Sequence, residues 1–193
     1  MNRVVLATRN AGKVAELQVL LTEVELVGLG EVAAYDEPAE TGATFAENAL
    51  IKARAAVAAT GLAAVADDSG LAVDALNGMP GVLSARWAGR HGDDVANLQL
   101  VLDQIADVPD ERRGAAFVCA AAYVGTDGTV IVEEATWRGR LTREPLGDNG
   151  FGYDPIFVPE GQDRTSAQLE PAEKNAISHR AQAFRALAAR LGS

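Results

Sequence analysis

The sequence predicts an α/β protein in which helices flank a mixed β-sheet, and three observations carry this prediction. Short apolar runs typical of buried strands occur along the chain, as at residues 4–7 and 63–66. Longer segments with apolar residues at helical spacing lie between them. The runs 115–124 and 129–137 are joined through Thr126-Asp127-Gly128, which is typical of a hairpin. Because a hairpin interrupts the alternation of strand and helix, we expect a mixed, elongated sheet in two lobes with a central cleft.

All of residues 1–193 are expected to form a single domain. Thr44-Phe45-Ala46-Glu47 is a capping box that predicts a helix start, and Gly61 is a suitable end for that helix. Asp93 or Asp94 can cap a further helix, which carries Val95, Leu98, Val101, Leu102 and Ile105 and ends at Pro109. The other expected elements are a helix over residues 12–21, a strand over 156–158 and a helical region over 171–191.

Composition and charge limit the possible functions. Hydrophobic residues make up 48% of the chain, enough for a full core without disulfides. The lone Cys119 lies in an apolar run, where we expect a buried side chain rather than a catalytic thiol, and one cysteine suits a reducing cytoplasm. The first apolar stretch is too short for a signal peptide or a membrane span. A net charge of −10 argues against nucleic-acid binding, and an anionic substrate would need a local basic cluster or a divalent cation.

Thr8-Arg9-Asn10-Ala11-Gly12-Lys13 lies between a predicted strand and a predicted helix. A helix N-terminus offers free N–H groups, and Lys13 adds a cation, so this segment is a candidate phosphate cradle. It lacks the spacing of a Walker loop. Capping of the helix by Asn10, with a solvated lysine, explains the same residues equally well.

Asp67-Asp68-Ser69-Gly70 follows the predicted strand 63–66, which should end there. Adjacent residues of an extended chain point to opposite sides, so one acid would face the cleft and the other would support it. Carboxylate oxygens are ligands that Mg²⁺ prefers, and a pair of acids after a buried strand is costly unless something positive binds. The alternative is a turn whose acids cap the next segment.

Glu40 precedes the capping box on a loop from which it could reach a metal ion. Asn48 and Lys52 are four residues apart and so share one helix face. The capping box alone accounts for Glu47, and a solvent-facing position is the default for Lys52.

Phe151-Gly152-Tyr153-Asp154 and the later run Lys174 to Arg180 combine aromatic faces, charges and hydrogen-bond donors, as a nucleotide site requires. His179 and Arg180 would point away from Lys174 on a continuous helix. They can serve one site only if the helix breaks near Ser178, which is a good N-cap for a new helix. A continuous surface helix, with the glycines forming a tight turn and the aromatic residues filling the core, is the alternative.

Together these segments resemble the inosine triphosphate pyrophosphatase family, the house-cleaning nucleoside triphosphate pyrophosphatases. The motifs occur in order over nearly the whole chain. They are Thr8-x-Asn10-x-x-Lys13, Glu40-Thr41-Gly42-x-Thr44-Phe45-x-Glu47-Asn48-Ala49, Ala66-Asp67-Asp68-Ser69-Gly70-Leu71, Pro80-Gly81-Val82-x-Ser84-Ala85-Arg86, Gly150-Phe151-Gly152-Tyr153-Asp154-Pro155 and Glu173-Lys174-Asn175-Ala176-Ile177-Ser178-His179-Arg180.

The resemblance implies a cytoplasmic homodimer that uses Mg²⁺ to hydrolyse purine nucleoside triphosphates with a 6-keto base, namely ITP, dITP and XTP, to the monophosphate and pyrophosphate. It implies that Asp68 is the proton acceptor and a metal ligand, with Glu40 as a second ligand. The substrate contacts it implies are Thr8, Arg9, Asn10, Ala11, Gly12, Lys13, Ser69, Phe151, Gly152, Tyr153, Asp154, Lys174, His179 and Arg180.

Two other functions fit parts of the sequence. A Maf-like nucleotide pyrophosphatase would act on other bases, whereas the segment His179-Arg180 favours purines. A nucleotide-binding regulator would hydrolyse nothing, and the acid pair beside a cationic cluster argues against it. Partners other than the nucleotide and a second copy, such as nucleic acid or a membrane, are not expected.

Overall fold

The computed structural model describes residues 3–8, 25–32 and 34–192. These residues form one six-stranded sheet with the hydrogen-bonding order β2-β1-β3-β4-β5-β6. Strand β1 is parallel to β2 and β3, whereas β5 and β6 are antiparallel, so the sheet is mixed as predicted. The strands are β1 (Arg3–Leu6), β2 (Glu25–Val27), β3 (Ala63–Val73), β4 (Gly114–Val124), β5 (Val130–Leu141) and β6 (Phe157–Pro159).

The described helices are α2 (Phe45–Thr60), α3 (Asp94–Gln104), α4 (Pro171–Ile177) and α5 (His179–Leu191), together with several 3-10 turns. The chain divides into two compact units. Unit 1 comprises Met1–Asp68, Cys119–Ala135 and Arg180–Ser193, and unit 2 comprises Ser69–Val118 and Thr136–His179. The helix predicted over residues 12–21 lies outside the described residues.

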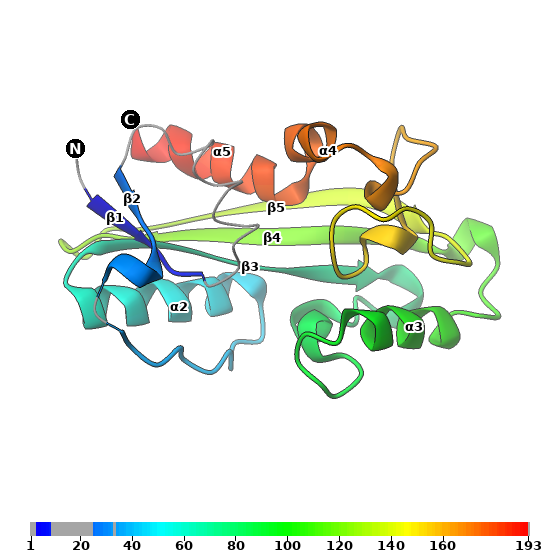
Figure 1. Ribbon diagram of the computed structural model, residues 1–193, viewed down its shortest axis with the longest axis horizontal. Coiled ribbons are helices and arrows are strands. Elements are labelled where there is room, and N and C mark those ends of the chain that lie inside the picture. The colour runs from blue at the N-terminus through cyan, green and yellow to red at the C-terminus, as the bar shows by residue number, and fades with distance from the viewer. Residues whose placement is uncertain (1–2, 9–24, 33, 193) are drawn as a thin grey trace. The chain divides into compact units, whose positions relative to one another are not determined.

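Unit 1 has helices on both faces of its strands: α2 on one side and α5 on the other (Figure 1). Alternation along β1 produces the two layers, because successive strand residues point to opposite faces. Val4 and Leu6 pack with Phe184 and Leu187 of α5, and Cys119 is buried in the same cluster. Val5 packs in a second cluster with alanines of α2.

Helix α2 begins and ends where its capping residues predict. Thr44 accepts a hydrogen bond from the Glu47 amide through its hydroxyl group, and the Glu47 carboxylate accepts one from the Thr44 amide. Gly61 ends the helix with a φ of 68°, a left-handed conformation that favours glycine. The structural interpretation of Glu47 is therefore confirmed.

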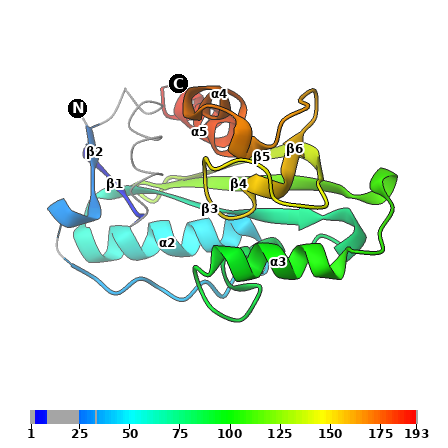
Figure 2. The ribbon, with the colours of Figure 1, turned by 45° about the vertical axis from the view of Figure 1, so that its right-hand side comes forward.

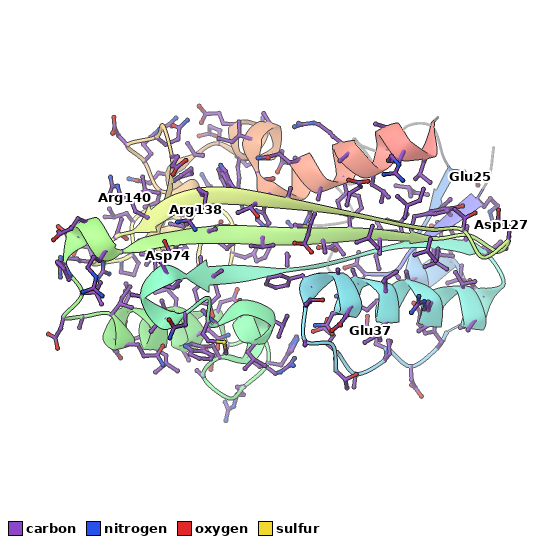
Figure 3. The ribbon with its side chains drawn as sticks, turned by 180° about the vertical axis from the view of Figure 1, so that it is seen from behind. Glu25, Glu37, Asp74, Asp127, Arg138 and Arg140 are labelled. Carbon is purple, nitrogen blue, oxygen red and sulfur yellow. The ribbon has the colours of Figure 1, made fainter. Side chains whose placement is uncertain are left out.

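Unit 2 has its own apolar core, against which α3 packs along one face of the strands (Figure 2). Asp93 caps α3, but the helix ends at Gln104, earlier than predicted, and Val95 is 80% exposed. Val95 lies on this helix as predicted, but on its solvent-facing side, because helical spacing alone does not fix how wide the buried face is. Asp74 and Arg138 form an exposed ion pair at 2.7 Å in this unit (Figure 3).

Arg113 is fully enclosed in unit 2, where its guanidinium group donates to three carbonyl oxygens, of Ile105, Leu141 and Thr142. Burial lowers the pKa of this guanidinium below its ordinary value, with a smaller contribution from the charge of Arg143. The three carbonyls replace the water that a buried cation loses.

Two segments differ from their predicted structure. Strand β3 does not end at Asp67 but continues to Val73, so both acids lie within a strand. An apolar run followed by acids suggested that the strand ends before Asp67. The strand continues because side chains from other segments pair with these acids and make their burial possible. Strand β2 was not predicted, because three residues carry too little pattern.

The C-terminal helical region is broken where the site hypothesis required it. Helix α4 ends at Ile177, Ser178 is extended with φ −65° and ψ 156°, and α5 begins at His179. No helix among residues 3–8, 25–32 and 34–192 is long and apolar enough to cross a membrane.

Candidate functional site

A cluster of opposite charges lies in unit 1, between α2 and β3. We call Glu40, Asn48, Lys52 and Asp68 the acid–lysine cluster. The Lys52 ammonium lies 2.9 Å from Glu40 Oε1 and 3.4 Å from Asp68 Oδ1. Asn48 Nδ2 donates to Asp68 Oδ2 at 3.0 Å. Asn48 and Lys52 thus use their shared helix face to hold one carboxylate.

Lys52 is a partly buried cation rather than a solvent-facing lysine, so the default expectation for it was wrong. Its side chain is 17% exposed. Burial by itself lowers the pKa of Lys52, but the negative charges of Asp68, Asp67 and Glu40 outweigh burial and raise this pKa above its ordinary value. Lys52 is therefore protonated at neutral pH and can stabilise negative charge.

Asn48 also ties the loop before α2 to the cluster. Its Oδ1 accepts a hydrogen bond from the Gly42 amide at 2.8 Å. A Cβ atom at Gly42 would lie 2.7 Å from this oxygen, so only glycine allows the loop to approach so closely. The loop that carries Glu40 is thereby fixed near Asp68.

The neighbouring acid, Asp67, has a different partner. Arg180 Nε lies 3.4 Å from Asp67 Oδ2, and both side chains are almost fully buried. Asp67 and Asp68 thus engage different partners, as alternation along a strand predicts. Thr8 lies just beyond the end of β1, two positions after Leu6, which pairs with Val65 of β3.

A second cluster lies in unit 2, and we call Phe151, Asp154, Ser166 and Lys174 the lysine–phenylalanine cluster. The Asp154 carboxylate accepts hydrogen bonds from the Lys174 ammonium, the Ser166 hydroxyl at 2.8 Å and the Phe151 amide at 2.9 Å. The Lys174 nitrogen lies 5.1 Å from the centroid of the Phe151 ring. Phe151 is 44% exposed, whereas Asp154 is 2% exposed. The exposed ring offers a stacking surface, and the buried acid holds the groups around it.

Glycines shape the segment that carries Phe151. Gly150 has a φ of +76°, and a Cβ atom there would collide with the Asp154 carboxylate. The Gly152 amide donates to Asp94 at 2.9 Å. Tyr153 is buried in the core of unit 2, where its hydroxyl donates to the Ser84 carbonyl at 2.8 Å. Tyr153 thus fills the core, as the alternative interpretation proposed, and Phe151 does not.

His179 lies on aromatic rings in unit 2. Its ring stacks with Phe117 at a centroid distance of 4.9 Å and with Trp137 at 6.2 Å. His179 is 5% exposed. No local pattern predicts this packing, because Phe117 and His179 lie 62 positions apart along the chain.

The structure brings some of the predicted site residues together. Glu40 and Asp68 meet in unit 1, and Phe151, Asp154 and Lys174 meet in unit 2. Ser69 follows Asp68 within β3 and is partly buried. Lys52 and Asn48 were not among the predicted site residues, although their spacing of four on α2 was a usable signal. Arg9, Asn10, Ala11, Gly12 and Lys13 lie outside the described residues.

Glu40 and Asp68 are the two residues of the acid–lysine cluster that could hold a divalent cation. Glu40 and Asp68 already share one positive group, the Lys52 ammonium. Within the described part of the chain, no three His, Cys, Asp or Glu side chains are placed to hold a metal ion. A metal bound to these two acids would complete its coordination with phosphate oxygens and water, as Mg²⁺ commonly does.

Comparisons with known proteins agree with the fold. The model of the Ham1 family matches residues 4–190. A dITP/XTP pyrophosphatase of Nocardia farcinica is 62% identical over 192 residues, which cover 97% of this chain and 93% of that protein. The crystal structure of a nucleoside-triphosphatase / dITP/XTP pyrophosphatase from Mycobacterium abscessus has a TM-score of 0.81 at 62% identity, covering 96% of this chain and 98% of that one. A HAM1 protein from Coxiella burnetii has a TM-score of 0.92 at 45% identity, covering 100% and 99%.

Proposed function

The chain belongs to the Ham1 family, and we propose that it hydrolyses non-canonical purine nucleoside triphosphates to the monophosphate and pyrophosphate. The proposed substrates are ITP, dITP and XTP, in keeping with the dITP/XTP pyrophosphatases that it resembles. The family resemblance expected from the motifs is confirmed. The observation that carries the proposed chemistry is the pairing of Asp68 with the protonated Lys52 and with Asn48.

In the proposed reaction, water attacks the α-phosphorus and the bond from this phosphorus to the bridging oxygen breaks. Asp68 accepts the proton of the water, and pyrophosphate leaves. This step requires charge neutralisation and alignment more than covalent chemistry. Lys52, a cation in a protein of net charge −10, is suited to neutralise the triphosphate.

Mg²⁺ is the proposed cofactor, with Glu40 and Asp68 as the protein ligands. When bound, Mg²⁺ would reduce the negative charge of the triphosphate and favour departure of pyrophosphate. The ion and Lys52 would then share these two acids. Residues 8–13 are proposed to contact the phosphates.

The lysine–phenylalanine cluster is proposed to bind the base. Stacking on Phe151 is worth about 1–3 kcal/mol and does not distinguish bases. Discrimination requires donors that pair with a 6-keto oxygen and that the 6-amino group of adenine leaves unsatisfied. We assign this role to His179 and Arg180, which are bonded neighbours at the start of α5. We also propose a homodimer located in the cytoplasm.

The test is release of pyrophosphate from a panel of nucleotides in the presence of Mg²⁺. ITP, dITP and XTP should be turned over with a higher kcat/KM than ATP or GTP. Faster turnover of dTTP or UTP than of ITP would favour a Maf-like activity instead. Absence of pyrophosphate release from every purine triphosphate, with nucleotide binding retained, would indicate a regulator.

A further inference from the structure

We infer that Phe117 and Trp137 are positioning residues for base selection, because they hold the imidazole ring of His179 in one plane. This inference rests on the proposed function, in which His179 contacts the purine base. Neither aromatic residue belongs to the sequence motifs or to the site residues predicted from them.

The geometry of the three rings supports a fixed plane for the imidazole. The planes of His179 and Phe117 differ by 10°, and those of His179 and Trp137 differ by 20°. Each of the three residues is at most 7% exposed. The ring of His179 is thus stacked in a nearly parallel arrangement and shielded from solvent, so tilting it would lose contact with both neighbours.

The two supporting rings are themselves held in place. Phe117 belongs to β4 and Trp137 to β5, which are adjacent in the sheet. Phe157 packs edge-on against Phe117 at a centroid distance of 4.7 Å and lies 5.4 Å from Trp137. Phe157 is in turn paired with Leu141 between β6 and β5. The imidazole therefore rests on rings that strands hold, which is a more rigid support than a loop.

The orientation of an imidazole matters because its polar groups lie only on its edge. The terminal torsion of histidine has broad minima, so the side chain alone does not define the ring plane. Hydrogen bonds weaken steeply as their angle departs from linear. A recognition group must therefore be held within about 10–20° of its productive orientation. A tilted ring would distinguish a keto oxygen from an amino group less well.

The alternative is that the aromatic residues only fill the core. Phe117, Trp137 and Phe157 do belong to the buried cluster of unit 2. A role in packing alone would lower stability and reduce activity toward ITP and ATP equally. A positioning role would instead change the ratio of kcat/KM for ITP to kcat/KM for ATP.

The experiment measures this ratio in the full-length protein with Mg²⁺. Phe117→Leu and Trp137→Leu keep apolar bulk and remove a stacking ring, and each should lower the ratio about three- to tenfold. Trp137→Phe retains a ring and should preserve most of the selectivity. Leu102→Ala, in the same core on α3, should lower Tm and leave the ratio unchanged.

A ratio equal to that of the wild type in both leucine variants would overturn the inference. If the wild type releases no pyrophosphate from ITP, the proposed function itself is wrong. If the wild type prefers ITP and both leucine variants keep this preference, the proposed function holds and only the positioning role is wrong.

An NMR measurement on the wild type tests the stacking on which the inference depends, even if the leucine variants do not fold. The chain has two histidines, and His91 is exposed. Ring currents of Phe117 and Trp137 should displace the carbon-bound proton signals of His179 away from those of His91. Signals of both histidines at unperturbed positions would show that the ring is not stacked and would overturn the inference.

Discussion

The ammonium group of Lys52 lies within 3.4 Å of the Asp68 carboxylate and also pairs with Glu40, so one lysine holds together two acids from separate segments. Removal of this charge would take away a cation that two partly buried carboxylates share. We therefore expect Lys52→Met to lower the free energy of unfolding by about 1–3 kcal/mol and to reduce kcat. Added MgCl₂ should raise Tm more in Lys52→Met than in the wild type, as measured by differential scanning fluorimetry.

Lys52→Arg is the matched variant, because it keeps the positive charge at this position. Its Tm should depend on MgCl₂ as weakly as that of the wild type. Equal dependence on MgCl₂ in all three proteins would contradict a cation site at Glu40 and Asp68.

Asp68→Asn should abolish most turnover and leave the fold intact. The amide is similar in size but cannot accept the proton of the attacking water, and general-base catalysis contributes about 10²–10⁴-fold. The measurement is kcat for ITP, with circular dichroism to check the fold. Asp74→Asn is the control, because Asp74 follows the same strand and pairs with Arg138 at the surface (Figure 3). Near-normal kcat in Asp68→Asn would remove Asp68 from the catalytic role.

His179→Ala should weaken the preference for ITP over ATP. The variant removes the polar edge proposed to pair with the base, while Phe151 remains available for stacking. We expect the ratio of kcat/KM values to fall and the fold to persist, with some loss of stability from the missing ring contacts. An unchanged ratio would place base selection at other residues.

Tyr153→Phe should change how stability depends on alkaline pH. Burial, and to a lesser degree the charge of Asp94, raises the pKa of Tyr153 above its ordinary value. An unfolded tyrosine ionises near pH 10, so the folded form binds more protons above that pH and stability falls as pH rises. Between pH 10 and the higher folded pKa, this residue contributes a slope of about −1.4 kcal/mol per pH unit.

Urea unfolding at several pH values measures this slope. Tyr153→Phe should be less stable than the wild type near neutral pH, because the hydrogen bond to the Ser84 carbonyl is lost. Its stability should then fall less steeply above pH 10. Parallel curves for the two proteins would show that Tyr153 ionises equally in the folded and unfolded chains.

Arg113→Met should destabilise the protein without changing its selectivity. The methionine would leave the carbonyls of Ile105, Leu141 and Thr142 without their buried donor. We expect a loss of about 2–4 kcal/mol in the free energy of unfolding, measured in urea. Arg112→Ala, at an exposed neighbouring position, should change the stability little. A small effect in both variants would mean that water replaces the guanidinium group.

Local signals in the sequence predicted local structure well. The capping box at Thr44, the glycine at 61 and the turn at Asp127-Gly128 all depend on residues close together in the chain, and the structure has each of them. A helix break near Ser178 was predicted on the condition that Lys174, His179 and Arg180 serve one site. Helix α4 does end there, and α5 begins at the next residue.

Features that depend on distant partners were missed. The burial of Asp67 within β3 requires Arg180, which lies 113 positions away along the chain. The aromatic support of His179 likewise comes from two strands of the sheet. Lys52 looked like a surface lysine, because nothing local shows that β3 presents an acid to α2. A one-dimensional pattern does not contain these pairings.

Gly150 leaves no room for a side chain beside the Asp154 carboxylate. In a library of random single substitutions, this position should therefore tolerate almost no replacement, although its residue offers no side chain to a nucleotide. Functional scans would flag it as strongly as a catalytic residue. Substitutions at Gly150 would fail because the Asp154 carboxylate, which holds Lys174, occupies the space that a side chain needs. Tm values should therefore be measured before Gly150 is assigned a chemical role.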